Sequence, residues 1–140
     1  NFLKKKAKNS TNDNKFYYNI AALLIHAAKI DENYEEVEKD IIKKTLIELG
    51  AGSSDIDILI SNAETIEENS NQILNFTKEV KDAPLSDKIK IVESLWKIIY
   101  SNSDADIYET NLMRRLAGLL YIDSKTMGNI KEKAKRELKK

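Results

Sequence analysis

The chain has no cysteine, one proline and four glycines among its 140 residues. Without cysteine it has no disulfide, thiolate metal site or cysteine nucleophile, and this composition fits the reducing environment of the cytoplasm. The scarcity of helix breakers favours helix throughout, and a hydrophobic content of 41% is enough for one ordinary core. These features predict a single, all-helical, cytoplasmic domain.

Long apolar runs are also missing. The longest candidate, residues 20–28, is interrupted by His26 and falls short of the roughly 20 residues that a membrane span requires. His26 is the only histidine, so neither a histidine-based metal site nor a catalytic triad is expected. The glycines stand too far apart for a phosphate-binding loop. Because the chain begins at Asn1 rather than Met, we expect it to be a fragment, and the cytoplasmic location is provisional.

The charge of the chain is balanced overall but unevenly distributed. Residues 1–15 contain five lysines and one aspartate, residues 125–140 contain seven basic and two acidic residues, and the middle is therefore strongly acidic. An acidic body argues against a nucleic-acid partner. We interpret the basic ends as solvated tails. Peripheral membrane contact through Phe2, Leu3 and the lysines after them is a further hypothesis.

Apolar periodicity predicts about seven helices within one domain at residues 15–140, after a disordered or linker-like lead-in at residues 1–14. Asp123 or Ser124 is expected to cap the last helix. Gly118 lies inside a helical pattern, which suggests close approach by another helix. The expected helices cover residues 15–30, 34–49, about 53–81 with a break that the pattern does not place, 86–101, 107–120, and from 123 onward.

Two halves of the sequence match at an offset of 71 residues without a gap. Leu24 aligns with Leu95, and Glu38 aligns with Glu109. The match predicts two pseudo-repeated helix–loop–helix halves. Chance agreement between two helical patterns is the alternative.

In each half, a polar turn leads into a helix that begins with acids. Acids three residues apart share a helical face, so each turn would gather oxygen ligands of the kind that calcium and magnesium prefer. An EF-hand is excluded because its sixth-position glycine and twelfth-position glutamate are missing. Capping of the helices by these acids, without a ligand, is the alternative. The polar residues are Asp31, Asn33, Glu35 and Glu38 in the first half, and Asn102, Asp104, Asp106 and Glu109 in the second.

Two stretches resemble the TerB-like family of tellurite-resistance proteins, in particular its small cytosolic bacterial members. They are residues 21–31 (AALLIHAAKID) followed by Glu38, and residues 95–102 (LWKIIYSN) continuing through Ile107-Tyr108-Glu109 to LMRRLA at residues 112–117. The resemblance covers about residues 16–130. It implies an all-helical fold of about seven helices, with an Asp-Gly turn in each half and a glutamate seven residues after the aspartate.

The match to this family pattern is unequal in the two halves. Asp31, Glu38 and Glu109 fit the pattern, whereas Asn102 stands in place of the second aspartate and Glu32 in place of the first glycine. Any inherited site should therefore rest mainly on the first half.

The resemblance implies a function without implying a reaction. The family is associated with tellurite and general stress response, with metal binding and with partner proteins, so we expect a non-enzymatic module that binds a protein partner. The alternative is a metal-dependent hydrolase in which the same acids hold a catalytic cation. The residues expected to hold a divalent cation, calcium or magnesium, are Asp31, Glu35, Glu38, Asp106 and Glu109.

Overall fold

The computed structural model describes the backbone of residues 2–30, 34–70, 74–101 and 107–138, and their side chains apart from those of 2–14, 74, 79 and 107–110. This part of the chain contains seven α-helices and no strand, as the sequence predicts. None of these helices has the length and hydropathy for crossing a bilayer. The elements are α1 (Phe2–Ile30), α2 (Glu36–Glu48), the short 3₁₀ turn η1 (Ser53–Asp55), α3 (Ile56–Glu68), α4 (Leu74–Val80), α5 (Leu85–Tyr100), α6 (Ile107–Leu119) and α7 (Ser124–Leu138).

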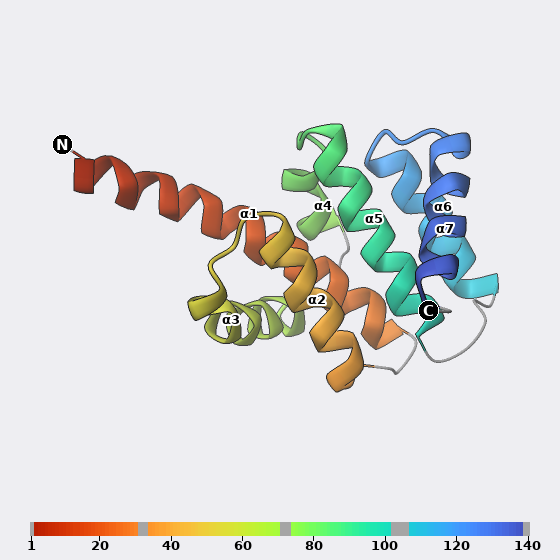
Figure 1. The fold of residues 1–140 in the computed structure, drawn as a ribbon, viewed down its shortest axis with the longest axis horizontal. Coiled ribbons are helices and arrows are strands. Elements are labelled where there is room, and N and C mark those ends of the chain that lie inside the picture. Colours follow the sequence, from red (N-terminus) through yellow and green to blue (C-terminus); the bar gives the residue numbers. More distant parts are fainter. Residues whose placement is uncertain (1, 31–33, 71–73, 102–106, 139–140) are drawn as a thin grey trace.

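The C-terminal half of α1 forms the centre of the bundle (Figure 1). Residues 20–28 are buried except for His26, because α1 packs against α2, α3, α4 and α5. α5 provides the other large apolar surface and packs against α1, α2 and α7. Leu24 and Leu95, which align in the two halves of the sequence, are both 0% exposed. Burial of these two apolar helix faces is the main force that holds the halves together.

The first helix begins at Phe2, well before the residue where apolar periodicity starts. The structure thus places residues 2–14, which the sequence analysis expected to be a disordered or linker-like lead-in, in N-terminal turns of α1 that extend away from the bundle (Figure 1). The segment has no glycine or proline and several lysines, so its backbone continues the helix without a strong energetic penalty. Periodicity does not detect such a segment because it reports a buried face rather than helix itself.

The helix boundaries otherwise lie close to the predicted positions. The break that the sequence pattern does not place falls between Glu68, the last residue of α3, and Leu74, the first residue of α4. At the start of α7, the Asp123 carboxylate accepts the N–H of Thr126 at 2.7 Å. This hydrogen bond holds the pKa of Asp123 below its usual value and confirms Asp123 as the capping residue.

The two halves repeat in the structure at the same offset as in the sequence. Shifting α2 (Glu36–Glu48) by 71 residues gives the bounds of α6 (Ile107–Leu119), and Ser53 at the start of η1 maps onto Ser124 at the start of α7. Matching bounds in one pair of helices, α2 and α6, and matching starts in a second pair of elements, η1 and α7, are not expected from chance agreement. The predicted pair of helix–loop–helix halves is therefore a feature of the fold.

The C-terminal ends of α2 and α6 are also built alike. In each, the second residue after the helix has a positive φ, which is 120° at Gly50 and 58° at Tyr121. In each, the N–H of the following residue donates to the carbonyl five residues earlier at 2.9 Å. This is the hydrogen-bond pattern of a Schellman motif, which commonly ends helices.

A side chain from the first helix of each half binds a carbonyl at this helix end. The Tyr17 hydroxyl donates to the carbonyl of Leu49 at 3.3 Å, and Lys88 Nζ donates to the carbonyl of Leu120 at 2.9 Å. Tyr17 and Lys88 are themselves 71 residues apart. The repeat therefore extends to side-chain contacts even where the residue type has changed.

No other helix of the described chain packs against Gly118. A Cβ atom built there meets no other atom within 4 Å, and the residue is exposed. The interpretation that this glycine allows close helix approach is wrong, because no other part of the described chain covers this face of α6.

We expect Gly118→Ala to raise the free energy of unfolding by up to about 1 kcal/mol, because alanine loses less backbone entropy in a helix and meets no obstacle here. Urea unfolding followed by circular dichroism measures the change. Gly50→Ala is the matched control with the opposite sign, because Gly50 has a φ of +120° and its added Cβ would lie 2.6 Å from the Tyr17 hydroxyl. A loss of stability in Gly118→Ala would contradict this account of α6.

Candidate functional site

Glu38, in the first turn of α2, is a buried acid at the point where the two halves meet. The residue is 1% exposed. Its Oε1 atom accepts the N–H of Glu35 at 2.8 Å, as part of a capping box at the start of α2. Its Oε2 atom accepts a hydrogen bond from the hydroxyl of Ser101, the residue after α5, at 2.7 Å. Glu38 therefore caps the N-terminal end of its own helix, and it links that helix to the second half of the molecule.

This link brings together the residues that flank the two acidic turns. The connection from α1 to α2 ends at Glu35, and the connection from α5 to α6 begins at Ser101. Both residues donate a hydrogen bond to the same carboxylate of Glu38. The two connections, which are far apart in the sequence, therefore leave the bundle from one place.

The predicted cation ligands are described to different extents. Glu35 is exposed and Glu38 is buried. Asp31 and Asp106 lie outside the described residues, and Glu109 lies in α6 with a side chain outside the described part. Among the described residues, no group of three or more histidine, aspartate or glutamate side chains is arranged to hold a metal ion. Both oxygens of Glu38 accept hydrogen bonds from the protein, as the capping alternative predicts, and its role as a cation ligand stays a prediction.

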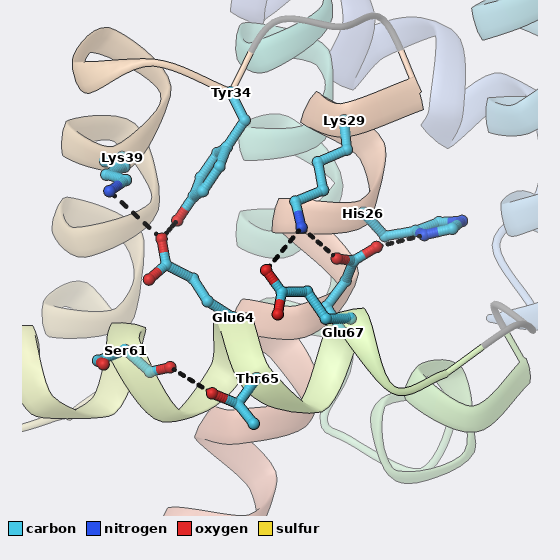
Figure 2. A network of polar contacts seen from close by, with 9 residues as sticks. His26, Lys29, Tyr34, Lys39, Ser61, Glu64, Thr65 and Glu67 are labelled. Atoms are coloured by element: carbon cyan, nitrogen blue, oxygen red, sulfur yellow. Dashed lines mark hydrogen bonds and ion pairs between the residues drawn. The ribbon is translucent and has the colours of Figure 1, made fainter.

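A second buried acid, Glu67 on α3, holds α3 against α1 (Figure 2). Its side chain is 9% exposed and is contacted by two side chains of α1, those of Lys29 and His26. Lys29 Nζ lies 2.7 Å from Oε1, and His26 Nδ1 lies 3.1 Å from Oε2. Burial of Glu67 opposes its ionisation, but the hydrogen bonds from Lys29 and His26 outweigh burial and hold the pKa of Glu67 below its usual value. The acid is therefore charged and fully engaged at neutral pH.

Tyr34, in the connection between α1 and α2, also contacts α3. Its hydroxyl donates to Glu64 Oε2 at 2.7 Å, and Lys39 Nζ on α2 lies 3.3 Å from the same oxygen (Figure 2). Burial, followed by the hydrogen bond to Glu64, raises the pKa of Tyr34 well above its usual value. These contacts fix the end of the α1–α2 connection on α3, beside the predicted cation site.

The contact of Glu67 with α1 was not predicted, although the sequence of α3 contains a signal for it. The buried residues of α3 recur at helical spacing, and Glu67 falls on that stripe four residues after Ala63. An acid on an apolar helix face needs a buried cationic or hydrogen-bonding partner. That rule predicts a buried partner for Glu67 without naming the helix or the residue that supplies it. The contact with Glu67 gives His26 a structural role.

A polar groove lies between α2 of the first half and α5 and α7 of the second. It has a volume of about 520 Å³, with the contacting hydroxyls of Thr45 and Ser94 among its lining residues. Lys97 Nζ lies 2.7 Å from Glu137 Oε2 and joins α5 to α7. This hydrogen bond holds the pKa of Glu137 below its usual value. Lys97 is the residue that aligns with His26, so each half uses this position to hold its third helix.

The repeated helices, their matching caps and the acid at their junction define a small all-helical domain with an internal duplication. Residues 18–132 match the family model described as tellurite resistance protein TerB. The chain belongs to the TerB family, as the resemblance in the sequence implies. No curated protein and no solved structure matches the chain.

Proposed function

We propose that this TerB domain is a non-enzymatic module that binds a protein partner, with a divalent cation at the joined acidic turns. The observation that supports the proposal is the contact of Glu38 with both Glu35 and Ser101, which anchors the flanks of the two turns at one place. Acids that come close together repel each other unless a cation or a basic partner neutralises them. Calcium and magnesium are the expected cations because the available ligands are carboxylate and amide oxygens.

Isothermal titration calorimetry with calcium and with magnesium tests the cation site. We expect the wild-type chain to bind one of these cations with a dissociation constant between the micromolar and millimolar ranges. Asp31→Asn and Glu109→Gln should each weaken binding at least about tenfold, because a carboxylate ligand is lost. Glu48→Gln is the matched control, since Glu48 is an exposed acid at the C-terminal end of α2, the opposite end of that helix from the acidic turn.

Thermal unfolding provides the second measurement of the same site. A cation that binds only the folded chain stabilises it by about 3 kcal/mol when its concentration is about 100 times the dissociation constant. The melting temperature of the wild type should rise with millimolar metal, and that of Asp31→Asn should rise less. Absence of both heat of binding and thermal shift at millimolar calcium and magnesium would contradict the cation site.

The family name leads us to propose a role in resistance to tellurite. A strain that lacks this gene should grow less well on tellurite, and the wild-type gene should restore growth. Asp31→Asn should restore less growth if the cation site serves this role. Equal growth of the deletion strain and its parent on tellurite would contradict the proposed role while leaving the binding measurements unaffected.

A further inference from the structure

A small apolar pocket lies between α5, α6 and α7, and neither Glu38 nor Ser101 is among its lining residues. Its volume is about 200 Å³. Trp96, Met113 and Met127 provide its large apolar side chains, and these residues are at most 7% exposed. The volume is comparable to the engineered cavity of about 150 Å³ that holds benzene. The pocket is therefore large enough for a ligand with an apolar body of about six carbons.

One side of the pocket has open space. Ala117 and Gly128 contribute little side-chain volume to its lining. A Cβ built at Gly128 would meet no atom within 4 Å. The two methionines are flexible and polarisable, so they adapt to apolar ligands of different shape.

Trp96 carries a buried polar atom that its surroundings leave unpaired. The residue is 4% exposed, and its Nε1 has no hydrogen-bond partner among the described residues. A buried N–H without an acceptor costs about 1–3 kcal/mol in other proteins, so most such groups are paired. An oxygen acceptor that reached this edge of the indole would supply the missing partner.

Two cations border the pocket. Lys131 Nζ lies 5.3 Å from the centroid of the Trp96 ring, and Arg114 is an exposed residue of the lining. Neither forms an ion pair with a described side chain. Both cations can attract an anionic group that approaches the pocket from solvent.

We propose that this pocket binds a small carboxylic acid with an apolar body. The apolar body lies against Trp96, Met113 and Met127, and the carboxylate meets Arg114 and Lys131. This site is independent of the proposed cation site at the acidic turns.

Hexanoate is a suitable probe, and Trp96 reports its binding because it is the only tryptophan in the chain. We expect hexanoate to change the fluorescence of Trp96 in a saturable way, with a dissociation constant on the order of 1 mM. Hexan-1-ol, which has the same apolar body without the charge, should bind several-fold more weakly, and acetate should not bind. A wild-type chain that shows no saturable response to hexanoate overturns the proposal.

Three variants test whether the change in Trp96 fluorescence comes from binding in this pocket. Arg114→Gln should weaken hexanoate binding several-fold and leave hexan-1-ol binding unchanged, whereas Arg115→Gln, its exposed neighbour outside the lining, should change neither. Gly128→Val should fill the open side and abolish both responses, with circular dichroism confirming that the helices are intact. Equal affinities in Arg114→Gln and Arg115→Gln, or full affinity in Gly128→Val, would also overturn the proposal.

Discussion

Glu38→Ala is expected to lower the free energy of unfolding by about 3 kcal/mol, the combined loss of a helix cap and of a hydrogen bond to a buried charge. The carboxylate is 1% exposed and accepts one hydrogen bond from its own helix and one from Ser101. Removal of the side chain leaves the N–H of Glu35 without its partner and breaks the link between the halves. Urea unfolding of wild type and variant measures the loss.

Two further variants separate the link from the cap. Glu36→Ala removes an exposed acid from the same helical turn and should cost less than about 0.5 kcal/mol. Ser101→Ala removes the link to Glu38 together with the contact of the same hydroxyl with the Ile98 carbonyl, 2.7 Å away at the end of α5, and leaves the cap of α2 in place. A double-mutant cycle between Glu38 and Ser101 should give a coupling energy of about 1–2 kcal/mol. A coupling energy near zero would mean that Glu38 acts only as a cap and that the two halves are not joined through it.

Glu67→Gln is expected to lower the free energy of unfolding by about 2 kcal/mol at neutral pH, because it removes the charge that two groups of α1 bind. The loss is smaller than for a fully buried pair, since Lys29 is 35% exposed and regains contact with water. Glu68→Gln is the matched control, because Glu68 is 69% exposed and lies 3.9 Å from Lys29. Equal stability of Glu67→Gln and wild type would contradict a structural role for this acid.

At acidic pH, the wild type and Glu67→Gln should have nearly the same free energy of unfolding. The pKa of Glu67 is lowered in the folded chain from its ordinary value of 4.5. A carboxylate with a lowered pKa contributes stability above the pKa of the unfolded chain, and this contribution is lost as the pH falls through the folded value. The wild type should therefore lose its advantage over Glu67→Gln progressively below about pH 4.5. A constant difference between neutral and acidic pH would show that the charge of Glu67 does not stabilise the fold.

The sequence predicted most of the fold because apolar periodicity reports buried helix faces directly. The apolar stripe on α5, for example, contains Ile89, which is half-buried, and four residues that are buried: Val92, Leu95, Trp96 and Ile99. The 71-residue offset proved to be the offset between α2 and α6. Periodicity did not detect the N-terminal turns of α1, because residues 2–14 present no apolar stripe. It also misread Gly118, because the spacing of a glycine does not tell whether another helix covers it.

The site was less predictable, because it depends on contacts between residues far apart in the chain. The sequence placed Glu38 at the start of a helix with other acids, but it gave no indication that Ser101 would bind its second oxygen. Glu35 and Glu38, three residues apart, are exposed and buried respectively, so sequence spacing alone does not make them joint ligands. The contact of Glu67 with Lys29 and His26 likewise requires the packing of α3 against α1.

The most direct test of the cation site is the anomalous scattering of a crystal grown with manganese, which shares the preference of calcium and magnesium for oxygen ligands. The proposal predicts one strong anomalous peak where the two connections leave the bundle, with Asp31 among its ligands and at least one carboxylate from the second half. A crystal that contains manganese but shows no peak at the two turns would contradict the proposal.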